Sequence, residues 1–249
     1  MSRVVAVVLA AGKGTRMESD LPKVLVPACG RPLVEYVLDT LEQVSVDESL
    51  VVVGYESEQV RQALSHRERI LFVEQTPQLG TGHAVQVCAP RLKGHHGPVL
   101  VLTGDSPMTR PESLRSLLDL YKRERPACIL GTLIKEDPSG LGRILRDGQG
   151  RFQGIIEEKD ATPQQHQIRE VNMSTYVFDC QPLLASLDRL TNHNRQEEYY
   201  LTDCPGILQS EGLSVRALPV LQPCEALSVN SLEDLERVEA ELRRTNMVS

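Results

Sequence analysis

The chain has 249 residues, 41% of them hydrophobic, and a formal net charge of −7. This length can bury the core of one large α/β domain or two small ones, and we expect a single domain over residues 1–249. The acidic balance argues against a general nucleic-acid or anionic-membrane surface, because both need a basic face. We therefore expect no nucleic-acid partner.

Cysteine spacing and hydropathy indicate the compartment. The six cysteines lie at least twenty positions apart, which excludes a Cys-x-x-Cys zinc or redox motif. Arg3 and the apolar run 4–11 resemble a short signal peptide, but cleavage there would destroy the glycine motif that follows. No apolar stretch reaches the length of a membrane span. We expect a cytoplasmic protein with free thiols and no membrane partner.

The first part of the chain, about residues 1–110, alternates strands with helices. Apolar and β-branched runs predict strands at 4–8, 50–53, 70–73 and 99–102. Helical spacing of apolar residues predicts helices at 33–44, 56–65 and 81–89. Pro32 suits the first turn of the first helix, and His83 is expected to pack under the loop before the third.

The second part, about residues 111–230, departs from this alternation. We predict a hairpin of strands 143–146 and 152–156, further strands at 128–134, 171–178 and 213–218, and helices at 111–125, 182–190 and 199–210. Ser231 is expected to cap a last helix at 231–245. Its inward residues would be Leu232, Leu235, Val238 and Leu242.

This order of elements predicts an α/β fold. Strands that alternate with helices form right-handed βαβ crossovers, so we expect a Rossmann-like, mainly parallel mixed sheet flanked by helices. Ligands of such sheets bind beyond the C-terminal strand ends. The loops after the first, third and fourth strands should therefore meet at one crevice.

The loop after the first strand, residues 9–17, reads as a phosphate-binding loop. Its alanines and glycines let backbone N–H groups approach a ligand. A dinucleotide fingerprint from Gly12 needs glycine where Met17 stands, and a P-loop needs Gly-Lys at Met17 and Glu18, so both motifs are excluded. Fixed positive charge comes from Lys13, Arg16 and Lys23.

Two other loops carry polar side chains at strand ends. Gln75 and Gln78 flank a glycine turn, and their amides suit the donors and acceptors of a uracil edge, with plain surface polarity as the alternative. Asp105 ends a buried strand, where a metal would relieve the cost of an unpaired carboxylate. Capping of the turn after Gly104 is the alternative for Asp105.

A series of short segments carries a resemblance to one family. They are residues 9–17, 21–25, 78–84, 104–105, 142–144, 157 with 159–161, 170–172, 198–203 and 229–230. With them the chain resembles the sugar-nucleotidyltransferases, and among these the uridylyltransferase domain of bifunctional N-acetylglucosamine-1-phosphate uridylyltransferases. The resemblance implies that UTP and N-acetylglucosamine 1-phosphate react to UDP-N-acetylglucosamine and pyrophosphate with the help of Mg²⁺.

The resemblance also implies the site residues. Arg16 and Lys23 would neutralise the triphosphate and the departing pyrophosphate, and Asp105 with Asn230 would hold Mg²⁺. The other substrate contacts would be Leu9, Ala10, Ala11, Gly12, Gly14, Gln75, Gln78, Gly80, Thr81, Thr103, Gly142, Glu157, Asn172, Tyr200 and Thr202.

Several alternatives stay open. Asn230 with Ser231 also suits a helix cap. Thr103 stands where the bacterial enzyme has tyrosine, and Met173-Ser174 replaces Thr-Gly, so a uridylyltransferase for glucose or N-acetylgalactosamine 1-phosphate is an alternative. A non-catalytic nucleotide-sugar sensor is another alternative. The presence of Lys23, Asp105 and Asn230 argues against it.

The family's second module is built from hexapeptide repeats, and these 249 residues contain none. We therefore expect no left-handed β-helix acetyltransferase domain in this chain. The sequence leaves open whether copies of the chain form a homo-oligomer.

Overall fold

The structure is a computed structural model that describes residues 3–14 and 20–245. Its strands are β1 (Val5–Leu9), β2 (Pro27–Ala28), β3 (Arg31–Pro32), β4 (Glu48–Val53), β5 (Ile70–Glu74), β6 (Pro98–Thr103), β7 (Cys128–Ile134), β8 (Arg143–Arg146), β9 (Phe152–Ile156), β10 (Glu170–Asp179) and β11 (Val215–Leu218). Its helices are α1 (Leu33–Gln43), α2 (Ser57–Ala63), α3 (Thr81–Gln86), α4 (Ala89–Leu92), α5 (Pro111–Glu124), α6 (Cys180–Leu187), α7 (Asp203–Ser210) and α8 (Leu232–Arg244).

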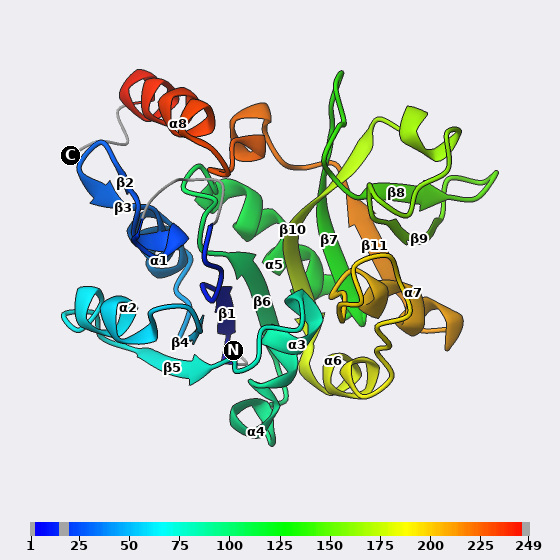
Figure 1. The fold of residues 1–249 in the computed structure, drawn as a ribbon. Helices are drawn as coiled ribbons and strands as arrows, with labels where there is room; N and C mark the ends of the chain where they lie inside the picture. The colour runs from blue at the N-terminus through cyan, green and yellow to red at the C-terminus, as the bar shows by residue number, and fades with distance from the viewer. Residues whose placement is uncertain (1–2, 15–19, 246–249) are drawn as a thin grey trace.

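A nine-stranded mixed sheet runs through the molecule in the order β11-β7-β10-β6-β1-β4-β5, with the β8–β9 hairpin attached to β10 (Figure 1). Strands β6, β1, β4 and β5 are mutually parallel, and β11 is parallel to β7. Only β10 runs antiparallel to both of its neighbours in the main path, β6 and β7. The sheet is therefore mixed and mainly parallel, as predicted.

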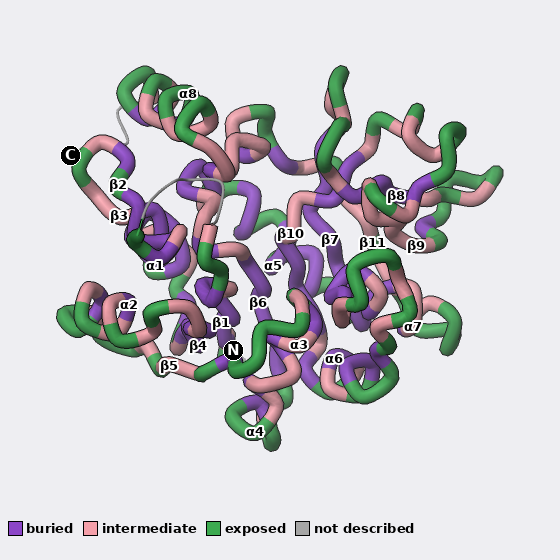
Figure 2. The backbone as a smooth tube through the Cα atoms, viewed as in Figure 1, coloured by how far each residue is buried: buried purple, intermediate pink, exposed green. Residues whose placement is uncertain are grey.

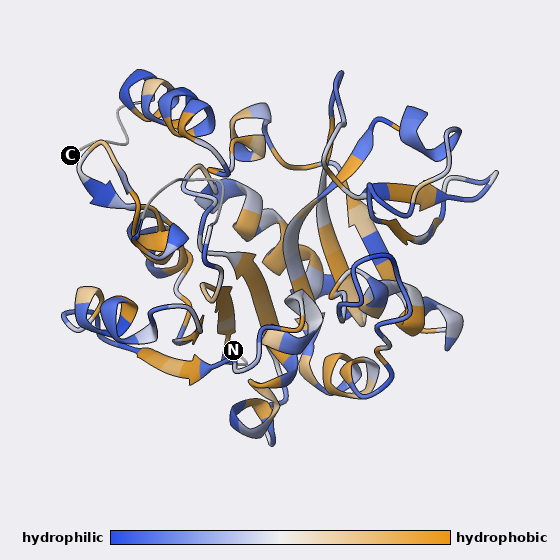
Figure 3. Ribbon diagram, viewed as in Figure 1, coloured by the Kyte–Doolittle hydropathy of each residue, from blue (hydrophilic) through white to orange (hydrophobic). Residues whose placement is uncertain are grey.

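Helices pack on both faces of the sheet, so its central strands are buried on both sides. In β1, Val5 and Val7 belong to the core shared with α3, α4, α6 and α7, whereas Ala6 and Val8 belong to the core shared with α1, α2 and α5. Successive side chains of a strand point to opposite faces, so an unbroken apolar run fills both cores. The central strands are accordingly buried in Figure 2 and hydrophobic in Figure 3.

Most predicted elements are confirmed to within a residue or two. Strands β7, β8 and β9 have the predicted bounds. The predicted helix at 81–89 is wrong as one element, because the chain forms α3 and α4 with a break between Gln86 and Ala89. Pro32 lies at the N-cap of α1 and not inside its first turn.

The predicted helix at 199–210 begins only at Asp203. Tyr199 is bonded through its backbone to the loop after β5: its N–H donates to Leu79 O at 2.8 Å and its carbonyl accepts from Gly82 N at 2.7 Å. Leu201 N donates to the Thr81 hydroxyl at 3.1 Å. A helix that began at Tyr199 would need the Tyr199 carbonyl as the acceptor for the N–H four residues on, and Gly82 N already occupies that carbonyl.

Helix α8 begins after the predicted cap, where Ser231 Oγ accepts from Asp234 N at 3.2 Å. Val238 and Leu242 are buried, but the inward placement of Leu232 is wrong, since Leu232 is 55% exposed. Val238 and Leu242 belong to a core cluster with Ala28 and Leu33, and the predicted inward residue Leu235 packs against that cluster while partly buried.

No disulfide joins the six cysteines, of which Cys88, Cys128, Cys180 and Cys204 are buried. Burial raises the pKa of the Cys88 thiol to about 12, so this thiol stays protonated and inert. Within the described ranges, no helix is long and apolar enough to cross a membrane.

Candidate functional site

The loop after β1 lies at the centre of the sheet, where Leu9 pairs with Val52 of β4 on one side and with Thr103 of β6 on the other. Its backbone is held by β4, because Ala10 N donates to Val52 O at 2.9 Å and Tyr55 N donates to Ala11 O at 3.1 Å. The loop that the sequence indicates for phosphate is therefore fixed at the C-terminal end of β1.

Gln78 connects the loop after β5 to this phosphate loop. Its side-chain nitrogen donates to Ala11 O at 2.6 Å. The approach requires Gly54 beneath it, since a Cβ there would lie 2.6 Å from Gln78 Nε2 and 2.9 Å from Ala11 Cβ. Gly54 was not among the predicted site residues, and its signal in the sequence is its position directly after a buried strand.

Gln75 is 4% exposed, and two neighbouring polar atoms fix the orientation of its side-chain amide. Nε2 donates to Gly80 O at 2.9 Å and lies 3.2 Å from His83 Nδ1. Gly80 has φ +103°, and a Cβ there would meet Tyr199 O at 2.7 Å. Glycine is needed at this position for both reasons. His83 packs beside the loop, as expected.

Lys23 lies between Asp105 and Asn230. Its ammonium forms an ion pair with Asp105 and donates to Asn230 Oδ1 at 2.7 Å. The Lys23 and Asp105 side chains are only 16% and 17% exposed. The Asn230 side chain also donates to Ser228 Oγ at 3.1 Å, and the helix cap is supplied by Ser231, so the Asn230 side chain is not used for capping.

This arrangement fits a divalent cation. A positive charge already lies against one carboxylate and one amide oxygen, which are ligands that Mg²⁺ accepts when substrate phosphates complete its shell. Among residues 3–14 and 20–245, no three His, Cys, Asp or Glu side chains gather as a metal cluster. A metal here would depend on oxygen ligands from the substrate.

Glu157, Thr202, Gly142 and Asn172 form a second group of predicted residues. Thr202 donates to Glu157 Oε1 at 2.8 Å. A Cβ on Gly142 would lie 3.6 Å from both Glu157 Oε2 and Asn172 Cβ, and Asn172 N donates to Gly142 O at 2.8 Å. Residues far apart in the sequence are thus gathered around one carboxylate.

The carboxyl groups near Glu157 affect one another. Burial raises the pKa of Glu157, and Asp160 and Glu198 raise it further against the opposing hydrogen bond from Thr202. Burial, with the charges of Glu157 and Asp160, raises the pKa of Asp203 to about 6. The pocket is therefore acidic and partly desolvated, which suits the hydroxyls of a neutral ligand group.

Two adjoining cavities hold most of the predicted residues. The first, of about 330 Å³, is lined by Leu9, Ala11, Gly12, Lys23, Val24, Gln75, Gln78, Gly80, Thr81, Ala84, Thr103, Asp105 and Glu198. The second, of about 210 Å³, is lined by Leu9, Thr81, Glu157, Ser174, Tyr176, Gln196, Glu198, Tyr200, Leu201 and Thr202. Leu9, Thr81 and Glu198 line both, so the cavities form one crevice.

Other predicted residues do not line these cavities. Ala10 is buried, and Gly14 packs against the Lys23 side chain. Gly142 and Asn230 contact lining residues as described above, and Asn172 Oδ1 also accepts from the N–H of the lining residue Ser174 at 3.3 Å. Arg16 lies outside the described residues. Glu198 and Tyr176 line the crevice and were missed, although Glu198 opens the quoted segment 198–203.

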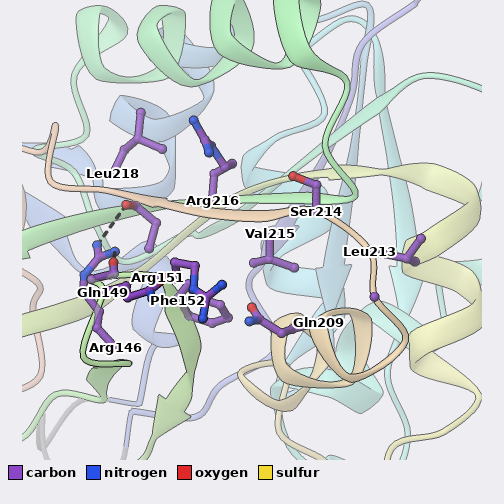
Figure 4. Close-up of a pocket in the computed structure, with 13 residues that line it drawn as sticks. Arg146, Gln149, Arg151, Phe152, Gln209, Leu213, Ser214, Val215, Arg216 and Leu218 are labelled. Carbon is purple, nitrogen blue, oxygen red and sulfur yellow. Dashed lines mark hydrogen bonds between the residues drawn. The ribbon is translucent and has the colours of Figure 1, made fainter.

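A larger cavity, of about 510 Å³, lies between the β8–β9 turn and β11 and contains no predicted site residue (Figure 4). Its arginines are already paired. Arg146 binds Glu170, Arg151 binds Asp147 and Arg216 binds Glu124. Size alone therefore does not make it the site.

A known protein family matches the part of the chain that forms this crevice. Residues 6–238 match the family of the MobA-like NTP transferase domain. The chain belongs to this family. The matched range includes both cavities and every predicted site residue.

Curated relatives and solved structures extend the comparison. The chain is 41% identical over 238 residues to the bifunctional protein GlmU of Clostridium perfringens and 40% identical over 244 residues to that of Shouchella clausii. These matches cover 96% and 98% of this chain but 52% and 53% of the relatives, so the chain spans about half their length.

A UDP-glucose pyrophosphorylase in complex with UDP-glucose superimposes with TM-score 0.78 at 16% identity, over 98% of this chain and 100% of the other. Its apo form gives 0.76 at 16% identity, over 99% and 100%. Likeness at this identity establishes the shared fold.

Proposed function

We propose that this NTP transferase is a uridylyltransferase that converts UTP and N-acetylglucosamine 1-phosphate into UDP-N-acetylglucosamine and pyrophosphate. The observation that carries the proposal is the continuous crevice in which the phosphate loop, the Gln75 loop and the Glu157 pocket meet. The motif series and the identity of about 40% to GlmU proteins support the same substrates.

The reaction needs charge stabilisation more than proton transfer. A phosphate oxygen of the sugar phosphate forms a bond to the α-phosphorus of UTP, and the bond from that phosphorus to the β-phosphate oxygen breaks, which releases pyrophosphate. A phosphate monoester has a second pKa near 6, so the nucleophile is ionised at neutral pH and needs no general base. The protein must hold the reactants in line and neutralise the growing charge.

In this scheme the nucleotide and the sugar bind in the two cavities. The phosphate loop at 10–14 and Lys23, with Arg16, neutralise the triphosphate, while Gln75 faces the base. Glu157 and Thr202 hold sugar hydroxyls in the second cavity. Asp105 and Asn230 would hold Mg²⁺, which when bound would neutralise phosphate charge.

Release of pyrophosphate from UTP, measured with a panel of sugar 1-phosphates, tests the proposal. The panel contains N-acetylglucosamine, glucose and N-acetylgalactosamine 1-phosphates, with Asp105→Asn as the inactive control. The highest kcat/KM is expected for N-acetylglucosamine 1-phosphate. A clear preference for another sugar 1-phosphate would identify that compound as the substrate instead. Nucleotide binding without turnover of any sugar 1-phosphate would indicate a sensor.

A further inference from the structure

We propose that His83 is a positioning residue for base recognition: its Nδ1 holds the Gln75 amide so that the amide oxygen is left for a pyrimidine whose N3 carries a proton. The inference rests on the proposed function, since it takes uridine as the nucleoside. It assigns a role to a histidine that is not among the residues that line the crevice.

The orientation of the Gln75 amide follows from its partners. Gly80 O, 2.9 Å away, is a carbonyl oxygen that can only accept, so the nitrogen of Gln75 and not its oxygen must lie there. That nitrogen carries two hydrogens, and the second acceptor in reach is His83 Nδ1 at 3.2 Å. With both hydrogens used, Gln75 has only Oε1 to offer to the cavity it lines.

His83 is itself held in place. When Nδ1 accepts, a neutral imidazole carries its proton on Nε2. The ring lies in α3 with its centroid 6.5 Å from that of Tyr199, whose backbone is bonded to the loop on both sides of Gly80. The acceptor that faces Gln75 therefore belongs to the rigid base of the loop.

The consequence is discrimination between pyrimidines. Uracil has a hydrogen on N3 that Oε1 accepts, whereas cytosine has a lone pair there. To accept cytosine the amide must rotate, which would turn its oxygen toward two acceptors, Gly80 O and His83 Nδ1. Sites with fixed polar groups reject a mismatched ligand because these groups are left unpaired.

Titration calorimetry with UTP and with CTP, in Mg²⁺ and without sugar phosphate, tests this role. His83→Leu removes the acceptor, and we expect it to lower the preference for UTP over CTP about tenfold, the effect of one neutral hydrogen bond. His83→Asn should restore most of the preference, because its side-chain oxygen can accept in place of Nδ1. His96→Leu, at an exposed histidine, should keep the wild-type preference.

The outcomes separate the two proposals. A preference in His83→Leu within threefold of wild type would overturn the role of His83 and leave the uridylyltransferase standing. Equal binding of UTP and CTP by the wild type would also overturn the role of His83, whereas absence of pyrophosphate release from UTP with every sugar phosphate would overturn the uridylyltransferase. Nitrogen-15 shifts of His83 in the wild type give a test that needs no variant: the Nε2–H tautomer is expected, and an Nδ1–H tautomer would contradict the assignment.

Discussion

The Lys23 ammonium donates to the Asn230 side-chain oxygen at 2.7 Å across 207 positions of the sequence, while it pairs with Asp105. One positive charge thus holds the two oxygens that we assign to a metal. Lys23 and a divalent cation would compete for the same ligands, because two cations within a few ångströms repel strongly in a partly buried site.

Removing the ammonium should therefore strengthen metal binding. We expect Lys23→Met to bind Mn²⁺ in the absence of nucleotide at least about tenfold more tightly than the wild type, as measured by electron paramagnetic resonance. Asp105→Asn serves as the control that lacks the charged ligand. Unchanged Mn²⁺ affinity in Lys23→Met would show that the lysine does not compete for the site.

The same residue should be needed for turnover. Lys23→Ala is expected to lower kcat by about 10²- to 10³-fold, the range for loss of one preorganised donor. Lys23→Arg should recover only part, because a planar guanidinium does not replace a point charge. Steady-state kinetics measure the effect, and circular dichroism checks that the variants fold. A kcat for Lys23→Ala within about threefold of wild type, roughly 0.7 kcal/mol in activation free energy, would show that Lys23 has only a structural role.

Asp105→Asn should abolish turnover without unfolding the protein. The amide keeps the shape of the side chain and an oxygen for Lys23, but it removes the only carboxylate of the proposed metal pair. Turnover in Mg²⁺ and thermal melting are measured together. Near-normal activity with an unchanged melting temperature would reject Asp105 as a ligand.

Gly80→Ala should weaken nucleotide binding. The backbone has φ +103° and the new Cβ would come within 2.7 Å of Tyr199 O, so the loop must shift at a cost of about 1–3 kcal/mol. We expect KM for UTP to rise about tenfold. Gly148→Ala is the matched control, since a Cβ there meets nothing within 4 Å. An equal KM for UTP in both variants would show that the conformation of the loop at Gly80 does not matter for nucleotide binding.

Stability should depend on pH through Asp203. Its folded-state pKa of about 6 lies above 3.8, so the folded chain binds a proton more tightly than the unfolded one and stability falls as pH rises from about 4 to 6. Asp203→Asn should therefore be more stable than wild type at pH 8, by about 1 kcal/mol after allowance for solvent screening, and equal to it near pH 4. Denaturant unfolding at both pH values measures this. A variant less stable at pH 8 would refute the raised pKa.

Local sequence patterns determined much of the fold. An apolar run with side chains on both faces predicted β1, and turn residues between two short alternating runs predicted β8 and β9 with their observed bounds. The glycine-rich loop after β1 was also visible in the sequence, because its small residues directly follow the apolar run of the strand. These features depend on neighbours within a few positions.

The tertiary structure decided which distant groups meet. The sequence predicted a helix over 199–210, yet Tyr199 bonds the loop after β5 through its backbone and the helix begins at Asp203. Lys23 reaches Asp105 and Asn230 across 82 and 207 positions, and Gln75 is oriented by Gly80 and His83. A backbone or side-chain group bonds whichever partner the packed sheet brings within reach, and that choice is not encoded in local spacing.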